Sequence, residues 1–145
     1  MMSQSVDDIL AQAELYSDDD IYRFITLPAN AITAAASVVA QVGNPFIALL
    51  VDKDEVTLML EDEDYHEYQK RLLDHQVSET RYRLITFDVV LESTLVGFMA
   101  RVTQILADAN ISVMPFAAFS RDHIFVSDTD FEKAMQVLAE LKSIK

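Results

Sequence analysis

The spacing of hydrophobic residues in the second half of the chain predicts a strand, a helix, a hairpin and a second helix. Apolar and polar positions alternate over 82–90, the pattern of a strand with one buried face. Over about 95–109 apolar residues recur every three or four positions, which predicts a helix with one buried stripe. Two β-rich runs around a polar turn predict a hairpin over 112–127, and a second amphipathic stripe predicts the last helix over 129–141.

The first half carries a weaker version of the same pattern. A strand is predicted over 22–27, a hairpin over 46–60 and a helix with an acidic first turn over 62–74. The segment 29–42 is ambiguous, because its alanines favour a helix while its β-branched residues weaken one. Three further predictions are a short helix over 3–14, a turn over 43–45 and a linker over 76–81.

An internal repeat relates the two halves. Tyr22–Leu27 matches Tyr82–Phe87 at four of six positions, and each copy is followed by a crossover, a hairpin and a helix. The alternative is a coincidence between two β-rich segments, but the shared order of elements favours a duplication. The sequence therefore predicts two related halves, of which the first has the shorter crossover.

Pro115 helps to place the strands of the second half. Proline cannot donate a ladder hydrogen bond, so a proline within a strand is tolerated mainly at a sheet edge or a bulge. It fits the second strand of a βαββαβ sheet with strand order 4-1-3-2, in which right-handed crossovers put both helices on one face. Neither half shows a clear fourth strand. Either the halves exchange strands or the N-terminal segment supplies the missing one.

Composition restricts the classes of function. The 145 residues contain no cysteine, which excludes disulfides, thiolate nucleophiles and cysteine-based zinc sites. The net charge is −13 and basic residues do not cluster, so nucleic acids and anionic membranes are poor partners. No apolar run approaches the ~18 residues of a membrane span, and no secretory signal is recognisable. We expect a cytoplasmic protein that binds no metal ion and no cofactor.

Three stretches of the second half carry recognisable motifs: Thr94–Val102, Ile105–Val113 and Asp122–Val126. Together they resemble the ACT domain, a regulatory module that senses small molecules. The resemblance covers roughly 82–141, with a degenerate copy over 22–74. It implies an α+β, ferredoxin-like (βαββαβ) antiparallel sheet with helices on one face, in two related halves, similar to small stand-alone proteins built from paired ACT domains.

Two positions depart from the usual pattern of the family. Thr94 stands where aspartate is common, and Asn110 stands where glycine is common. Threonine and aspartate are both good helix N-caps, and asparagine tolerates the left-handed conformation that ends many helices. We therefore expect the backbone geometry of the family at both positions, without the contribution of an aspartate carboxylate to a ligand.

The resemblance also implies a binding site. Members of the family often bind an amino acid or a similar molecule at an interface between two modules, near the first strand–helix turn and the second strand. A helix N-terminus attracts a carboxylate, and Asp122 could accept an ammonium or guanidinium group. The implied ligand-binding residues are Ser93, Thr94, Leu95, Val96, Gly97, Ile111, Ser112, Val113, Met114 and Asp122.

Structural roles compete with ligand binding at most of these positions. Gly97 could admit a ligand, but tight packing of the helix on the sheet is the favoured interpretation. Ser93 or Thr94 is expected to cap the helix, and Asn110 to end it. An aspartate before a strand, such as Asp122, is ordinary turn chemistry.

We expect three segments: an N-terminal helix and acidic linker over 1–20, a degenerate half over 21–76 and an ACT domain over 77–145. The sequence shows no nucleophile–base constellation and no glycine-rich loop, so an enzyme is not expected. The expected function is a non-enzymatic regulatory module that binds a small molecule between halves or between the subunits of a homodimer. The alternative is the same fold used for self-association through its sheet edges, without a ligand.

Overall fold

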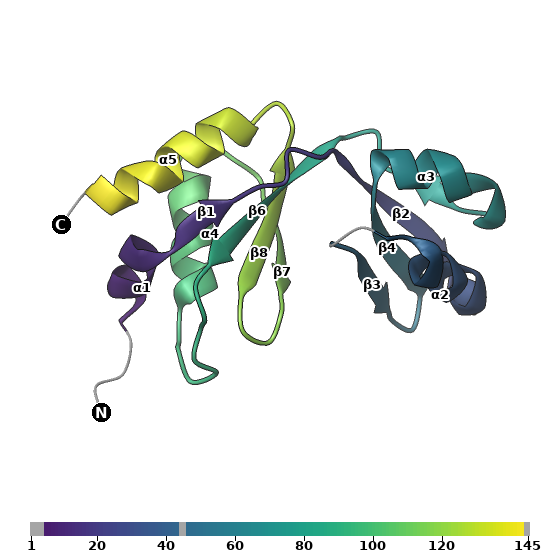
Figure 1. Cartoon of the computed structure of the whole chain (residues 1–145), viewed down its shortest axis with the longest axis horizontal. Coiled ribbons are helices and arrows are strands. Elements are labelled where there is room, and N and C mark those ends of the chain that lie inside the picture. The colour runs from purple at the N-terminus through teal and green to yellow at the C-terminus, as the bar shows by residue number, and fades with distance from the viewer. Residues whose placement is uncertain (1–4, 44–45, 144–145) are drawn as a thin grey trace. The chain divides into compact units, whose positions relative to one another are not determined.

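The computed structural model describes residues 5–43 and 46–143. For Lys142 and Ser143 it describes the backbone only. The chain divides into two compact units, each shown with its elements in Figure 1. Asp20–Arg81 forms the inserted unit. Met1–Asp19 and Tyr82–Lys145 together form the split unit, which is built from both ends of the chain. The turn predicted over 43–45 falls largely outside the described residues, because Asn44 and Pro45 are not among them.

The inserted unit is a complete βαββαβ fold. Its elements are β2 (Tyr22–Pro28), the 3₁₀ turn η1 (Ala29–Ala31), α2 (Ile32–Gln41), β3 (Ala48–Val51), β4 (Glu55–Glu61), α3 (Asp62–Tyr68), the 3₁₀ turn η2 (Gln69–Arg71) and β5 (Gln76–Val77). The antiparallel strands lie in the order β5-β2-β4-β3. This is the predicted 4-1-3-2 order, and it resolves the ambiguous segment 29–42 as a helix entered through a 3₁₀ turn.

The fourth strand of the inserted unit corrects one prediction. The segment 76–81 was expected to be a linker, yet it begins with β5, which pairs with Ile25 and Thr26 of β2. The backbone N–H of Ser78 then donates to the carbonyl of Phe24 at 2.8 Å. Two paired residues are too few to produce a periodic pattern, so the sequence gives no sign of this strand.

The split unit has the same fold with a different chain order. Its elements are α1 (Val6–Gln12), β1 (Glu14–Tyr16), β6 (Tyr82–Asp88), α4 (Phe98–Asp108), β7 (Met114–Ala117), β8 (Asp122–Ser127) and α5 (Phe131–Ser143). The antiparallel strands lie in the order β1-β6-β8-β7. Strand β1 takes the place of the fourth strand, with Leu15 opposite Phe87. Of the two sources of a fourth strand left open by the sequence, the N-terminal segment is the one used here.

The division into units differs from the expected segments in two places. The N-terminal segment was expected to be separate, but Ile9, Leu10 and Ala13 are buried in the core of the split unit. Residues 77–81 were expected in the second half, but they belong to the inserted unit. Both differences have one cause: each fourth strand pairs with a first strand that is distant in sequence, and the sequence pattern carries no information on that pairing.

Each unit buries one helical layer against one sheet face, as the amphipathic stripes predict. In the split unit α1, α4 and α5 contact one another and share a core. That core consists of Ile9, Leu10, Ala13, Ile85, Phe87, Phe98, Val102, Leu106, Ile111, Ile124, Val126, Phe131, Ala134 and Leu138. The core of the inserted unit consists of Ile25, Leu27, Ala35, Val38, Val56, Leu58, Leu60, Tyr65 and Leu72. Pro115 lies in β7, opposite Ile124, and β7 is the edge strand that the proline predicts.

A matched arginine cluster shows that the two units are related. Arg23 on β2 bonds Asp62 at the start of α3 (2.9 Å) and lies 5.7 Å from the ring of Tyr65. In the split unit, the equivalent Arg83 on β6 contacts an aspartate and an aromatic ring in the same places. Its partners are Asp128 at 3.4 Å, just before α5, and the ring of Phe131 at 3.8 Å. The repeat recognised in the sequence is therefore also a repeat of side-chain contacts.

Across the described part of the chain, none of the helices has both the length and the apolar character needed to cross a membrane.

Candidate ligand-binding site

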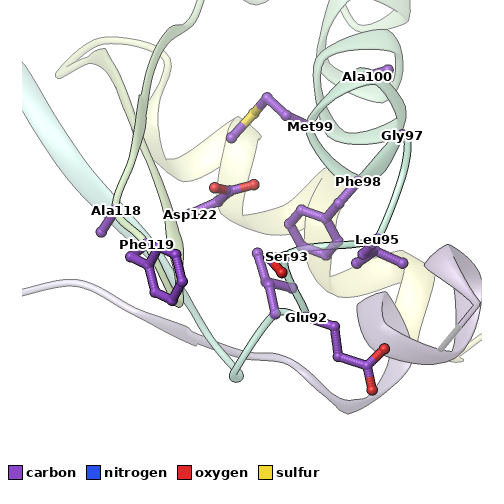
Figure 2. Close-up of a pocket in the computed structure, with 11 residues that line it drawn as sticks. Glu92, Ser93, Leu95, Gly97, Phe98, Met99, Ala100, Ala118, Phe119 and Asp122 are labelled. Atoms are coloured by element: carbon purple, nitrogen blue, oxygen red, sulfur yellow. The ribbon is translucent and has the colours of Figure 1, made fainter. Parts of the chain in front are cut away.

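A pocket of about 370 Å³ lies in the split unit where the loop between β6 and α4 meets the turn between β7 and β8 (Figure 2). The start of α4 forms one wall of the pocket. The lining residues are Leu91, Glu92, Ser93, Leu95, Gly97, Phe98, Met99, Ala100, Ala118, Phe119 and Asp122. Backbone bonds hold the two loops together: the N–H of Leu91 donates to the carbonyl of Ser120 at 2.7 Å, and that of Ala118 to Arg121 at 2.9 Å.

The N-terminus of α4 borders the pocket without a side-chain cap. Gly97 occupies the cap position with φ of 91°, and no side chain accepts a hydrogen bond from the first turn. The first N–H groups of a helix have no acceptor within the helix and carry the positive end of its dipole. The residues of that first turn, Phe98, Met99 and Ala100, all line the pocket. This wall can therefore receive a carboxylate.

The expected capping by Ser93 or Thr94 is wrong, because α4 begins at Phe98 and not at Leu95. The loop 89–97 is long enough to carry both residues away from the helix end. Ser93 instead lines the pocket, and its hydroxyl has no hydrogen-bond partner within the described residues. Thr94 is exposed and does not line the pocket.

Gly97 is required for its backbone conformation and not for close packing. A Cβ atom built at this position would meet nothing within 4 Å, so the favoured packing interpretation is wrong. Its φ of 91° lies in the region that residues with a side chain rarely adopt. The conformation turns the loop into the helix and leaves the first N–H groups of α4 uncovered.

We predict that Gly97→Ala lowers the free energy of unfolding by about 1–2 kcal/mol, because the alanine must adopt positive φ. Urea denaturation of both proteins would measure the difference. Gly43→Ala is the matched control, since Gly43 also has open space around it and shows no positive φ. A loss at Gly97 no larger than at Gly43 would contradict the conformational explanation.

Asp122 supplies a negative charge to the other side of the pocket. Its carboxylate is half-buried, and Figure 2 shows it directed toward the start of α4. Burial raises the pKa of this carboxyl above its ordinary value. The neighbouring Arg121 does not neutralise it, because Arg121 bonds Asp88 at 3.1 Å. Within the described residues the carboxylate of Asp122 has no hydrogen bond or ion pair, so its charge is available to a ligand.

The structure brings together only part of the predicted site. Ser93, Leu95, Gly97 and Asp122 line the pocket, whereas Val96 projects outward and is 85% exposed. The segment 111–114 does not line it.

The position of residues 111–114 follows from the way α4 ends. Asn110 has φ of 61° and ends the helix as predicted, with its N–H donating to Ala107 at 2.9 Å. Residues 111–114 therefore follow the C-terminal end of α4, and Ile111 is buried in the core. Strand β7 starts only at Met114, later than the predicted strand. Ligand contact by 111–114 stays a prediction.

Asp122, at the end of the β7–β8 turn, was predicted as a site residue, but two other residues of this region that line the pocket were missed. Ala118 and Phe119 lie there, opposite Met99 and Phe98 of α4 (Figure 2). The available signal was Phe119 itself, a large apolar residue directly before a polar turn, which is 90% exposed in the structure. Glu92 was also missed, and adds a second carboxylate to the lining.

His123 does not contribute to the pocket lining. Its Nδ1 lies 2.8 Å from the hydroxyl of Thr86 on the neighbouring strand. Burial, together with the charge of Arg121, lowers the pKa of His123, which favours the neutral ring. Among the described residues, no three His, Asp or Glu side chains are grouped so that they could hold a metal ion.

Residues 77–140 match the family model of the ACT domain. This segment is an ACT domain. The match covers the strands and helices that surround the pocket, and leaves out β1 and the inserted unit before residue 77. Among curated proteins no match to the chain was found.

Solved structures similar to this chain extend over both units. A protein of unknown function from Vibrio cholerae, described as a possible transport protein, is 26% identical, with 95% of this chain and 96% of that chain covered and a TM-score of 0.70. A protein from Agrobacterium tumefaciens is 20% identical (90% and 89% covered, TM-score 0.69). The regulatory subunit of aspartate kinase from Thermus thermophilus, in a ligand-free form, is 12% identical (88% and 97% covered, TM-score 0.64). The predicted α+β fold of paired ACT-type halves is thereby confirmed.

Proposed function

We propose that this protein is a non-enzymatic regulatory module that binds an amino acid or a similar small molecule in the pocket beside α4. One observation carries the proposal: an uncapped helix N-terminus and an unpaired carboxylate, Asp122, line the same pocket. The helix end attracts a carboxylate, and Asp122 attracts an ammonium group. A zwitterion presents both charges, so the pocket suits the main-chain end of an amino acid. Similarity to a regulatory subunit of aspartate kinase supports the regulatory part of the proposal.

Regulation would work through a difference in affinity. A ligand shifts a conformational equilibrium only by as much as it prefers one state over another. The pocket is open to solvent at Phe119, which is 90% exposed, and a second copy of the chain could close it. The proposed regulatory unit is therefore a homodimer in which ligand binding favours one arrangement of the subunits.

Self-association without a ligand is the second candidate. Strand β3 is the edge of the sheet in the inserted unit, and its side chains Leu49, Leu50 and Val51 are exposed. Exposed apolar edge strands are prone to pair with another chain. If association is the whole function, light scattering will show a dimer or larger particle whose mass and stability do not respond to any amino acid.

We predict that at least one standard amino acid raises the thermal stability of the protein. A ligand present at 100 times its dissociation constant stabilises the folded state by about 2.7 kcal/mol. A thermal-shift series with each amino acid at millimolar concentration measures this. Asp122→Asn should weaken the response, because the amide cannot attract an ammonium group as a carboxylate does.

Asp54→Asn is the matched control for this experiment. Asp54 is an exposed carboxylate in the turn between β3 and β4 of the inserted unit, paired only on the surface with Lys53. The control should retain the full response. If no standard amino acid raises the melting temperature of the unmodified protein, binding of the standard amino acids is refuted. If Asp122→Asn and Asp54→Asn weaken the response equally, a role of Asp122 in binding is refuted.

A further inference from the structure

We infer that the pocket beside α4 selects an amino acid with a large uncharged apolar side chain, and that Phe119 determines this specificity. The inference rests on the proposed function and adds the class of ligand to it. The two charged groups of the main chain would occupy the α4 N-terminus and Asp122. What remains of the lining then decides which side chain is accepted.

Apart from the polar residues Glu92 and Ser93, the remaining lining includes six residues with apolar side chains. These are Leu91, Leu95, Phe98, Met99, Ala118 and Phe119. Apolar surface removed from water contributes favourably in proportion to its area, so an aliphatic or aromatic side chain gains more here than glycine does. Methionine side chains add adaptability to such a wall, because the unbranched thioether can follow ligands of different shape.

A charged side chain on the ligand would gain little binding free energy in this pocket. No lysine, arginine or histidine occurs among its lining residues, and the nearby Arg121 is held by Asp88. An acidic side chain would meet the negative charges of Asp122 and Glu92 without a counter-charge. A basic side chain could pair with Glu92, but Glu92 is exposed, and exposed ion pairs contribute little.

The size of the pocket also limits the ligand. Small-molecule sites commonly span about 300–1,000 Å³, and the present volume of about 370 Å³ lies near the lower end. A single amino acid is more suitable for this volume than a peptide or a nucleotide. Phosphate-bearing molecules are disfavoured further by the two carboxylates in the lining.

Phe119 stands at the mouth of the pocket on a well-fixed turn. Its side chain is 90% exposed, although neighbouring backbone groups are tied by the Ala118–Arg121 and Leu91–Ser120 hydrogen bonds. Figure 2 shows its ring across the pocket from Leu95 and Phe98. The ring can cover the side chain of a ligand whose main chain is held at α4.

The test is a calorimetric titration of the full chain with leucine, methionine, phenylalanine, glycine, aspartate, glutamate, lysine and arginine. We expect the best of the first three to bind at least about tenfold more tightly than glycine, and the acidic pair to bind least. Phe119→Ser should remove most of that tenfold difference while leaving the affinity for glycine and the ligand-free melting temperature nearly unchanged. Leu73→Ser, at an exposed position of the inserted unit, is the matched control and should change neither.

The outcomes separate the inference from the proposed function. If lysine, arginine, aspartate or glutamate binds best, the pocket is a site for a charged amino acid and the inference is overturned, while the proposed function stands. If none of the eight binds but another standard amino acid raises the thermal stability, the inference is overturned and the proposed function stands; if no standard amino acid does so, both are overturned. If Phe119→Ser behaves like Leu73→Ser although apolar amino acids bind best, the assignment of specificity to Phe119 is overturned.

Discussion

Replacing Ile9 by alanine is expected to destabilise the split unit by about 2–5 kcal/mol, although Ile9 lies more than seventy residues before the strand it helps to cover. Its side chain is 2% exposed and packs into the same core as Ile85, Phe98 and Leu138. Truncation removes buried apolar surface and leaves a cavity that the surrounding helices only partly fill. The measurement is urea denaturation combined with hydrogen exchange of the backbone amides in β6 and α5.

The matched control for Ile9→Ala is Ala11→Gln on the same helix. Ala11 is exposed, and glutamine is nearly as good a helix former as alanine, so the expected loss is only a few tenths of a kcal/mol. Loss of protection in β6 with Ile9→Ala alone would show that α1 and β1 stabilise the ACT domain. If Ile9→Ala matched the control, the N-terminal segment would be dispensable for the fold of the split unit.

The elements that could be predicted are those with a local repeating signal. The stripe of α4 and the alternation of β6 each recur over enough positions to define a buried face. Pro115 identified the edge strand because its chemistry excludes it from the interior of a sheet. The order of strands followed from these elements and the handedness of crossovers, and the structure confirms it in both units.

The fourth strands could not be predicted, for a physical reason. Strand β1 has three residues and β5 has two, which is too short for alternation to be visible. Each is held by backbone hydrogen bonds to a first strand far away in sequence, and such bonds place little demand on residue type. The N-terminal segment was therefore predicted as a short helix, and its role as the source of a fourth strand stayed one of two alternatives.

The sequence predicted the position of the pocket better than it predicted which residues line it. Its position at the strand–helix turn followed from the ACT resemblance, and Asp122 proved to lie in the same pocket. The role of Gly97 was misjudged because a sequence does not distinguish a glycine needed for positive φ from one needed for close approach. Phe119 was missed because no repeating pattern governs single residues in turns.

The matched arginine clusters show how a duplicated fold can be kept with different connections. In the inserted unit Nε and Nη2 of Arg23 both donate to the carbonyl of Ser78, at 3.1 and 2.6 Å, just after the fourth strand. In the split unit the fourth strand comes from the N-terminus, and Arg83 bonds Asp19 instead, at 2.9 Å. The Nε atom of Arg83 is then left buried without a partner. The arginine of the inserted unit is therefore the more fully satisfied of the two.

Arg23→Ala is accordingly expected to destabilise the inserted unit by about 3–4 kcal/mol. The side chain of Arg23 is 12% exposed and that of its partner Asp62 is 19% exposed. Removing the guanidinium therefore takes the main partner away from a largely buried carboxylate and from the carbonyl of Ser78. Arg81 and His66 lie 3.5 and 3.4 Å from Asp62, but both are about half-exposed and can replace only part of the interaction with Arg23. Urea denaturation followed by tyrosine fluorescence measures the loss.

Two further variants separate the causes of the loss at Arg23. Arg23→Lys keeps the charge but not the planar fork, so it should recover the attraction to Asp62 while leaving the Ser78 carbonyl poorly satisfied, with a loss of about 1–2 kcal/mol. Lys53→Ala removes an exposed ion pair with Asp54 and should cost less than about 0.5 kcal/mol. If Arg23→Ala cost no more than Lys53→Ala, the cluster would be an incidental surface contact, and its repetition at Arg83 would no longer indicate a structural requirement inherited by both halves.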